Sequence, residues 1–219
     1  MKKSTQGKMK VREHPRVTFS SLAEVLSSPS HRLPAILTKQ KYPQAGPVFG
    51  YKKATEKIVS WCVNGTELNS SDMSREYEAD VVNHISNNYH TPNEMCGVEA
   101  SSFSKPPQVE TWSIGDVEVS VFPDVLVESE IKGQMKTGAI KFYMNKTPTE
   151  VGASLAALIY YHQSEVLGKS DVDPSLCAVV DIQHDEVHIA TGSYKRLVKQ
   201  ASDACKVIAS VWDSLDKPE

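Results

Sequence analysis

The chain has 219 residues, of which 40% are hydrophobic and 23% charged, and this length suits one folded domain with an extension. No apolar run approaches the roughly 20 residues of a membrane span. The first residues, MKKSTQGKMKVREHPR, are charged and precede no hydrophobic stretch, unlike a secretory signal. Four widely spaced cysteines without a CxxC pair indicate free thiols. We therefore expect a cytoplasmic protein with no membrane partner.

The net charge of -3 argues against a generally basic nucleic-acid binder, but the charge is unevenly distributed. Residues 1–60 contain twelve Lys and Arg against three Glu, a net charge of +9, which leaves -12 for the other 159 residues. A basic N-terminal third could hold a polyanion, and it could equally serve only to keep the protein dissolved. The candidates for phosphate contact in this region are Arg32, Lys52, Lys53 and Lys57.

Hydrophobic periodicity divides the chain into a flexible basic tail (1–16), a helical N-terminal extension (17–70) and a core (71–219). The extension includes a predicted helix over 48–63. Because helical and strand patterns alternate in the core, an α/β fold with a central mixed sheet flanked by helices is expected. The predicted core elements are a helix over 72–88, a loop over 90–108, strands over 109–114, 116–128 and 137–145, a helix opening at 147, a strand over 175–183, its hairpin partner over 184–191, and a helix over 193–215.

Two ionisable residues occupy neighbouring strands of the predicted sheet. Asp124 follows Pro123 at the start of the strand-forming run PDVLVE, and Lys141 lies within the next strand. If these strands are antiparallel neighbours, the two side chains converge on one face at one end of the sheet. Glu78 shares the apolar face of its helix and is expected to point towards the core, where it could join them, whereas Glu76 points outward.

An Asp, a Lys and a helix Glu on one buried face suit the hydrolysis of a phosphodiester. That reaction needs a hard divalent cation held by carboxylate oxygens. It also needs a positive group that steers water and offsets developing negative charge, which a lysine beside the metal can provide. A lysine is rarely buried without a partner, so a carboxylate near Lys141 is expected whatever its role.

The Pro123–Asp124 pair, Lys141, the helix Glu78 and the α-β-β-β-α-β order resemble the PD-(D/E)XK nuclease superfamily. The helical N-terminal region is similar to that of its RecB-like and phage exonuclease members. The resemblance covers residues 72–192. It implies a restriction-endonuclease-like core and a deoxyribonuclease that uses Mg²⁺ or Mn²⁺. It also implies DNA as the partner, with duplex DNA favoured, and a role in phage or bacterial DNA processing or defence.

The resemblance also implies a role for each matching residue. Asp124 corresponds to the metal-binding aspartate, Lys141 to the catalytic lysine, and Glu78 to the helix carboxylate that assists metal binding and catalysis. Ile140 corresponds to the residue whose backbone carbonyl contacts the metal. Tyr160, on the helix after the lysine strand, corresponds to a position that faces DNA in RecB-like nucleases.

One position departs from the family pattern, because Ala139 stands where the second acidic residue belongs. Glu150, at the start of the next helix, is a candidate for a relocated carboxylate, although it also completes a capping box with Thr147. Glu128 shares the face of Asp124 but lies about 13 Å along the strand, too far for the same ion.

Three hypotheses therefore remain open from the sequence. The chain is an active nuclease, an inactive nuclease-fold protein that binds nucleic acid or protein, or an unrelated α/β protein in which the Pro–Asp pair is coincidental. Separately, Asp124 and Lys141 could form a structural ion pair without a metal. The spacing of His184 and His188 is that of a zinc-protease motif, but both fall in a predicted hairpin, so no zinc site is expected. The choice of DNA or RNA, endo- or exonuclease action, and a homo-oligomer or a partner DNA-processing protein all stay open.

Overall fold

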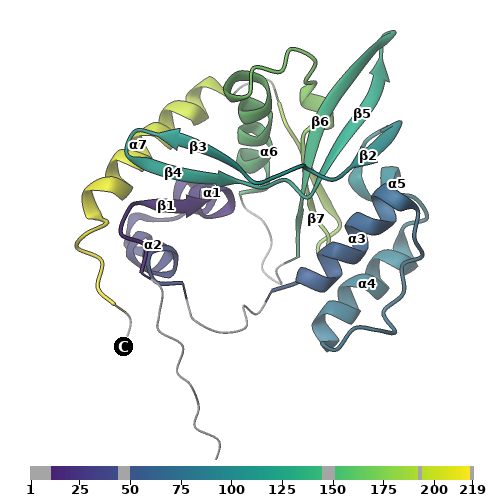
Figure 1. Ribbon diagram of the computed structural model, residues 1–219, viewed down its shortest axis with the longest axis horizontal. Helices are drawn as coiled ribbons and strands as arrows, with labels where there is room; N and C mark the ends of the chain where they lie inside the picture. Colours follow the sequence, from purple (N-terminus) through teal and green to yellow (C-terminus); the bar gives the residue numbers. More distant parts are fainter. Residues whose placement is uncertain (1–10, 44–49, 145–150, 192–193, 218–219) are drawn as a thin grey trace, which may run out of the picture. The chain divides into compact units, whose positions relative to one another are not determined.

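The computed structural model describes residues 11–43, 50–144, 151–191 and 194–217 (Figure 1). The chain forms two compact units, each assembled from segments that are distant in sequence. The first unit comprises Met1–Gly50, Thr111–Val121 and Lys199–Glu219, and the second comprises Tyr51–Glu110 and Phe122–Val198. Helices pack on a β-sheet in both units, which confirms the α/β class with mixed sheets flanked by helices.

The first unit is built on a three-stranded sheet in the order β1-β4-β3, with β1 parallel to β4. Thr18 ends β1 and caps α1, since its hydroxyl accepts a hydrogen bond from the Ser21 amide at 3.2 Å. The elements of this unit are β1 (Arg16–Thr18), α1 (Phe19–Ser27), the 3₁₀ turn η1 (Ser30–Arg32), α2 (Leu33–Lys41), β3 (Glu110–Ile114), β4 (Val117–Val121) and α7 (Lys195–Val211).

A buried lysine joins two ends of the first unit. Lys41 closes α2 and is only 7% exposed. Its ammonium donates to the main-chain carbonyls of Trp212 at 2.6 Å and Leu215 at 3.4 Å, just beyond the C-terminus of α7. The ammonium thereby ties the end of α2 to the main chain that follows α7, where the Leu215 amide also donates to the Trp212 carbonyl and the Tyr42 hydroxyl also donates to the Leu215 carbonyl.

The second unit contains a five-stranded sheet in the order β2-β5-β6-β7-β8. The pairs β2–β5, β5–β6 and β7–β8 are antiparallel, whereas β6 and β7 are parallel and are connected through α6. The elements of this unit are α3 (Lys52–Asn64), α4 (Glu76–Asn88), α5 (Pro92–Cys96), β2 (Ser102–Ser104), β5 (Val125–Ile131), β6 (Gln134–Tyr143), α6 (Gly152–Tyr161), the π-helical turn η2 (His162–Val166), the 3₁₀ turn η3 (Pro174–Leu176), β7 (Ala178–Asp181) and β8 (Glu186–Ile189).

Helices cover both faces of this sheet (Figure 1). The α3, α4 and α5 helices bury one core against the strands, with Ile58 and Val82 facing Val125 and Ile140. Side chains alternate along a strand, so the neighbours of Val125 and Ile140 face the opposite side, where α6 contacts β6, β7 and β8. Helices therefore cover both faces of the central strands of this sheet, and β7 is buried along its whole length.

The long strand predicted over 116–128 is wrong. The structure ends β4 at Val121 and begins β5 at Val125, and the two strands belong to different sheets. Pro123 lies between them and has no N–H to donate to a ladder, so it suits the point where the chain leaves one sheet for another. Asp124 therefore lies at the entrance of β5, and the prediction that the Pro–Asp pair stands at the start of a strand is confirmed.

The loop predicted over 90–108 is also wrong in part, because it contains α5 and β2. β2 has three residues and pairs with the outer edge of β5, where Phe103 faces Val127. The strand predicted over 109–114 forms as β3, but it joins the sheet of the first unit. The three antiparallel strands of the second unit are therefore β2, β5 and β6.

The other predicted elements are confirmed with shifted ends. α3, α4 and α7 begin four, four and two residues later than expected, at Lys52, Glu76 and Lys195. The strand and hairpin predicted over 175–191 form β7 and β8. The predicted start of the helix after β6, including Glu150, lies outside the described residues.

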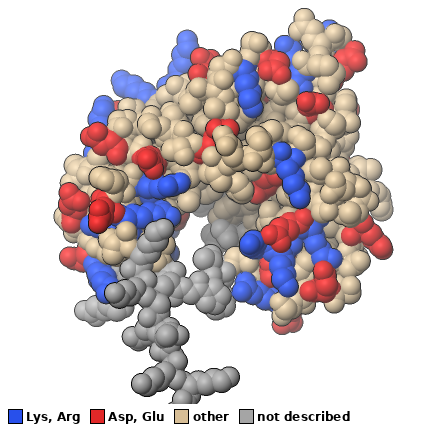
Figure 2. Space-filling model, in the orientation of Figure 1, with Lys and Arg blue, Asp and Glu red and all other residues tan. Residues whose placement is uncertain are grey.

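The surface of the second unit carries mixed charge over α3 and α4, where Figure 2 shows Lys and Arg side chains interleaved with Asp and Glu. This face is therefore not a continuous basic track. All four cysteines are buried and free. None of the helices in the described part of the chain is long and apolar enough to cross a membrane.

A close approach at Gly138 gives a test of the packing around β6. A Cβ at this position would overlap the main-chain carbonyl of Leu176 in η3. We expect Gly138→Ala to lower the free energy of unfolding by about 3 kcal/mol or more, because a backbone atom cannot step aside as a side chain can. Urea unfolding followed by circular dichroism measures this loss.

Gly65 provides the control for that experiment. It ends α3 with a φ of 66°, and no atom lies within 4 Å of the position that its Cβ would occupy. Gly65→Ala should therefore cost only the left-handed strain of about 1 kcal/mol. Equal losses in the two variants would contradict the close packing of β6 against η3.

Candidate functional site

Asp124 and Lys141 meet at the end of the β5–β6 pair. The Lys141 ammonium lies 3.0 Å from Asp124 Oδ1, and the Phe142 amide donates to Asp124 Oδ2 at 2.7 Å. The Asp124 side chain is 3% exposed and that of Lys141 is 24% exposed. The predicted contact is present because the pairing of Val125 with Ile140 places residues 124 and 141 opposite each other in the antiparallel register.

A pocket of about 450 Å³ opens beside this ion pair, within the size range of small-ligand sites. Its walls come from the first two turns of α3, from the segment that follows β2, and from the entrance of β5. The lining residues are Lys52, Thr55, Glu56, Val59, Lys105, Pro106, Phe122, Asp124 and Lys141. Three lysines and two carboxylates therefore face one cavity, which can receive an anion or an anion with its counter-cation.

Burial raises the pKa of Asp124 above the ordinary aspartate range, although the Lys141 charge and the Phe142 amide act in the opposite direction. The loss of hydration therefore outweighs one lysine and one amide donor. A carboxylate in that condition gains from any further cation brought into the pocket. Perturbed carboxylates in pockets are characteristic of functional sites.

Glu78 points into the core as expected, being 2% exposed, but it does not line this pocket. Its Oε1 accepts hydrogen bonds from the amides of Lys53 at 2.8 Å and Ala54 at 3.4 Å, at the start of α3. The side chain therefore caps a helix N-terminus that has no cap of its own, where a negative charge is favourable. The structure does not bring Glu78 to Asp124 and Lys141.

The helix carboxylate that does reach the pocket is Glu56, which the sequence analysis missed. Its side chain is 64% exposed and lies 3.8 Å from the Lys52 ammonium. Lys52, Thr55, Glu56 and Val59 follow the i, i+3, i+4, i+7 spacing of one helix face. This spacing was the sequence feature that could have pointed to Glu56 as a pocket residue. A solvent-exposed helix face gives the same polar pattern, so the spacing alone does not identify a pocket.

The residues predicted to contact phosphate do not lie together on one surface. Lys52 lines the pocket, while Lys53 and Lys57 lie on another face of α3, where Lys57 pairs with Asp72 at 2.7 Å. Arg32 is exposed in the first unit. Lys105 also lines the pocket, in the loop that follows β2, and the sequence analysis did not single it out.

The other residues that the sequence analysis singled out either do not line the pocket or lie outside the described residues. The Ile140 carbonyl accepts the Asp124 amide at 2.8 Å. Ala139 is fully buried and pairs with Leu126 across the β5–β6 ladder. Tyr160 is partly buried on α6, with its ring edge-on to Tyr194. Glu150 lies outside the described residues.

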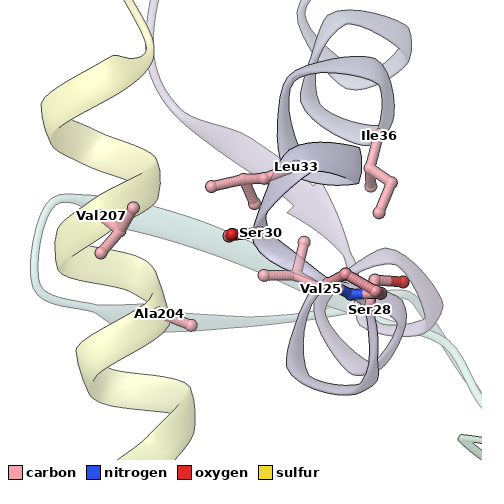
Figure 3. A pocket seen from close by; sticks show the side chains of 8 residues that line it. Val25, Ser28, Ser30, Leu33, Ile36, Ala204 and Val207 are labelled. Atoms are coloured by element: carbon pink, nitrogen blue, oxygen red, sulfur yellow. The ribbon is translucent and has the colours of Figure 1, made fainter.

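A second pocket lies in the first unit and has fewer groups that could take part in binding or catalysis. It has a volume of about 210 Å³ and lies between α7 and the α1–α2 region (Figure 3). None of its lining residues is ionisable: Val25, Ser28, Pro29, Ser30, Leu33, Ile36, Ala204 and Val207. The pocket that contains Asp124 is therefore the stronger functional candidate.

Comparison with known proteins adds no family to this description. No family model matches the chain, and neither a curated protein nor a solved structure matches it. The geometry of the pocket and the resemblance of its motif are therefore the grounds on which a function can be proposed.

The donor set can be tested for its fit to a divalent cation. In the described ranges, no three His, Cys, Asp or Glu side chains converge. Asp124 and Glu56 face the pocket, and Mg²⁺ is commonly bound by one or two carboxylates with water and substrate phosphate completing its shell. Asp124 and Glu56 are the residues that would hold such an ion, with water and substrate phosphate completing its shell.

The energetic state of Asp124 gives a prediction that separates a functional site from a structural ion pair. We expect Asp124→Asn to leave the stability within about 1 kcal/mol of wild type, or to raise it, because the substitution removes a poorly compensated buried charge. An ion pair that holds the fold together would instead lose about 3–5 kcal/mol when one partner is removed. Urea unfolding at neutral pH distinguishes the two.

The difference in unfolding free energy between wild type and Asp124→Asn should depend on pH, and the direction of that dependence follows from the raised pKa of Asp124. The pKa of Asp124 is raised in the folded chain, so the folded state binds the proton more tightly than the unfolded state. Wild-type stability relative to Asp124→Asn should therefore fall as pH increases from the ordinary aspartate range through the raised pKa. A relative stability that increases with pH over this range would contradict the assignment.

Proposed function

We propose that the chain is a divalent-metal-dependent nuclease of the PD-(D/E)XK type that hydrolyses phosphodiester bonds in DNA. The observation that carries the proposal is the Asp124–Lys141 contact of 3.0 Å at the edge of a charged pocket. The order of the second unit supports it: helices, the antiparallel strands β2, β5 and β6, a crossover through α6, and β7 parallel to β6. This order supports the restriction-endonuclease-like core that the motif implies.

In this mechanism Lys141 has the central role among the residues of the chain. Its ammonium is held by Asp124 and remains partly open to the pocket, so it can orient a water molecule and offset negative charge that develops on the phosphate. Asp124 and Glu56 would hold Mg²⁺ or Mn²⁺. When bound, that cation supplies Lewis-acid activation of the phosphate and of water. Lys52 and Lys105 would bind neighbouring phosphates.

A second candidate function is a binding module of the same fold without hydrolysis. Ala139 favours it, because the position of the second carboxylate is filled by a fully buried methyl group. The exposed lysines of the pocket would still bind a polyanion. The raised pKa of Asp124 favours the enzyme, since a pure binding site gains nothing from a buried carboxylate that is only partly compensated.

The proposed cellular location and partners follow from the nuclease assignment. A nuclease of this type would act in the cytoplasm of a bacterial cell or a phage-infected host, in DNA processing or defence. DNA is the proposed partner, alone or with a DNA-processing protein or a second copy of the chain.

Cleavage of linear duplex, circular and single-stranded DNA with Mg²⁺ or Mn²⁺ tests the proposal directly. Wild type should cleave at least one substrate, EDTA should abolish cleavage, and Asp124→Asn and Lys141→Met should each reduce the rate by about 10²-fold or more. Glu56→Gln should cause a smaller loss. Glu76→Gln, on the exposed face of α4, is the control and should leave the rate unchanged.

Two results would count against the enzyme. Cleavage that survives in both Asp124→Asn and Lys141→Met would come from another site or another protein. Folded wild type that binds DNA but cleaves none of the substrates would favour the binding module.

The salt dependence of DNA binding tests which lysines contact phosphate. Replacing Lys52 and Lys105 together by Gln should make the slope of log K against log salt shallower by about 1.8 for duplex DNA, since each phosphate contact contributes about 0.9. Fluorescence anisotropy at several salt concentrations gives the slope. Lys57→Gln is the matched control, because its ammonium already pairs with Asp72.

An equal change of slope in the Lys57→Gln control and in the double variant would contradict the assignment of phosphate contacts to the pocket. The whole of α3, rather than its pocket-facing stripe, would then be the contact surface.

A further inference from the structure

Phe122 is an exposed aromatic residue in the wall of the charged pocket. It lies between β4 and β5, two residues before Asp124, and 48% of its surface is exposed. The Lys141 ammonium lies over its ring, 5.5 Å from the ring centre. The same side chain therefore touches the ion pair and presents apolar surface to the cavity.

Single exposed apolar residues are common on proteins, so exposure alone explains nothing. The other strongly exposed large apolar side chains in the described part of the chain are aliphatic or methionine: Val11, Val109, Met135, Val166, Val187, Ile189 and Val207. Phe122 is the aromatic member of this group, and it is the member that lines the pocket. Pro106 and Val59 add apolar wall beside it.

An aromatic ring beside several cations is the arrangement that binds unpaired nucleotides, because the ring stacks on a base while the cations hold phosphate. Lys52, Lys105 and Lys141 supply the cations in this pocket. The Lys141 ammonium lies over one face of the Phe122 ring, and 48% of the residue is exposed, so a base would stack on the other face while the lysines bind its phosphate.

We propose that Phe122 is a specificity-determining residue that stacks on the base next to the scissile phosphate, and that the substrate at this site is a single-stranded segment or an unpaired end. In a duplex the bases are stacked on each other and paired, so a base cannot reach a ring in the pocket without leaving the helix. This inference rests on the proposed function for the presence of nucleic acid in the pocket. It goes beyond that function in assigning the strandedness of the substrate.

Binding measured without cleavage tests the inference. Fluorescence anisotropy with Ca²⁺ in place of Mg²⁺ would compare a labelled single strand with the same sequence as a blunt duplex. Phe122→Leu, which keeps an apolar side chain but loses the ring face, should weaken single-strand binding by about 5- to 100-fold and leave duplex binding unchanged. Phe122→Trp should keep or strengthen single-strand binding.

A second readout reports stacking itself. A single strand that carries 2-aminopurine should lose fluorescence on binding to wild type and to Phe122→Trp, and should lose less on binding to Phe122→Leu. Met135→Ala, at another strongly exposed apolar position on β6, is the control and should behave as wild type. Thermal unfolding of each variant confirms that it is folded.

The outcomes separate this inference from the proposed function. Single-strand affinity and 2-aminopurine quenching that do not depend on Phe122, or an equal loss for single strand and duplex, would overturn the inference even if the protein cleaves DNA. Loss restricted to the single strand would support it even if no cleavage is found in the separate assay. Absence of nucleic-acid binding by folded wild type would overturn both.

Discussion

The burial of one carboxylate organises the candidate site. Asp124 has almost no exposed surface, and it is held by one amide donor and one lysine ammonium. Those two partners do not restore what the carboxylate loses in hydration, so its pKa is raised. The pocket is therefore built around an incompletely compensated carboxylate, and Lys52, Lys105 and Glu56 line the same pocket.

The α3 helix connects this chemistry to the stability of the second unit. Its apolar face packs into the core, and its N-terminus is capped by Glu78 from α4. The stripe that contains Lys52 and Glu56 is thereby fixed at the end of the sheet, where Asp124 enters β5. Glu78 supports the site through the position of α3, and it does not share the pocket.

The sequence was sufficient to predict the Asp124–Lys141 contact, because strand alternation is local and the hairpin between β5 and β6 leaves one register that pairs them. It also predicted that Glu78 points inward. It could not show that the amides of Lys53 and Ala54 occupy that carboxylate, since this contact joins positions more than 20 residues apart. β2 was missed because three residues with exposed serines at both ends give no strand pattern.

The measurement that tests the central claim most directly is paramagnetic line broadening by Mn²⁺ in amide NMR spectra, with a non-cleavable single strand bound. If Asp124 holds the metal, Mn²⁺ should broaden the amide signals of Lys141 and Phe142 in wild type at concentrations that leave them sharp in Asp124→Asn. Equal broadening in the two proteins, or none near these residues, would contradict a metal-dependent centre at Asp124.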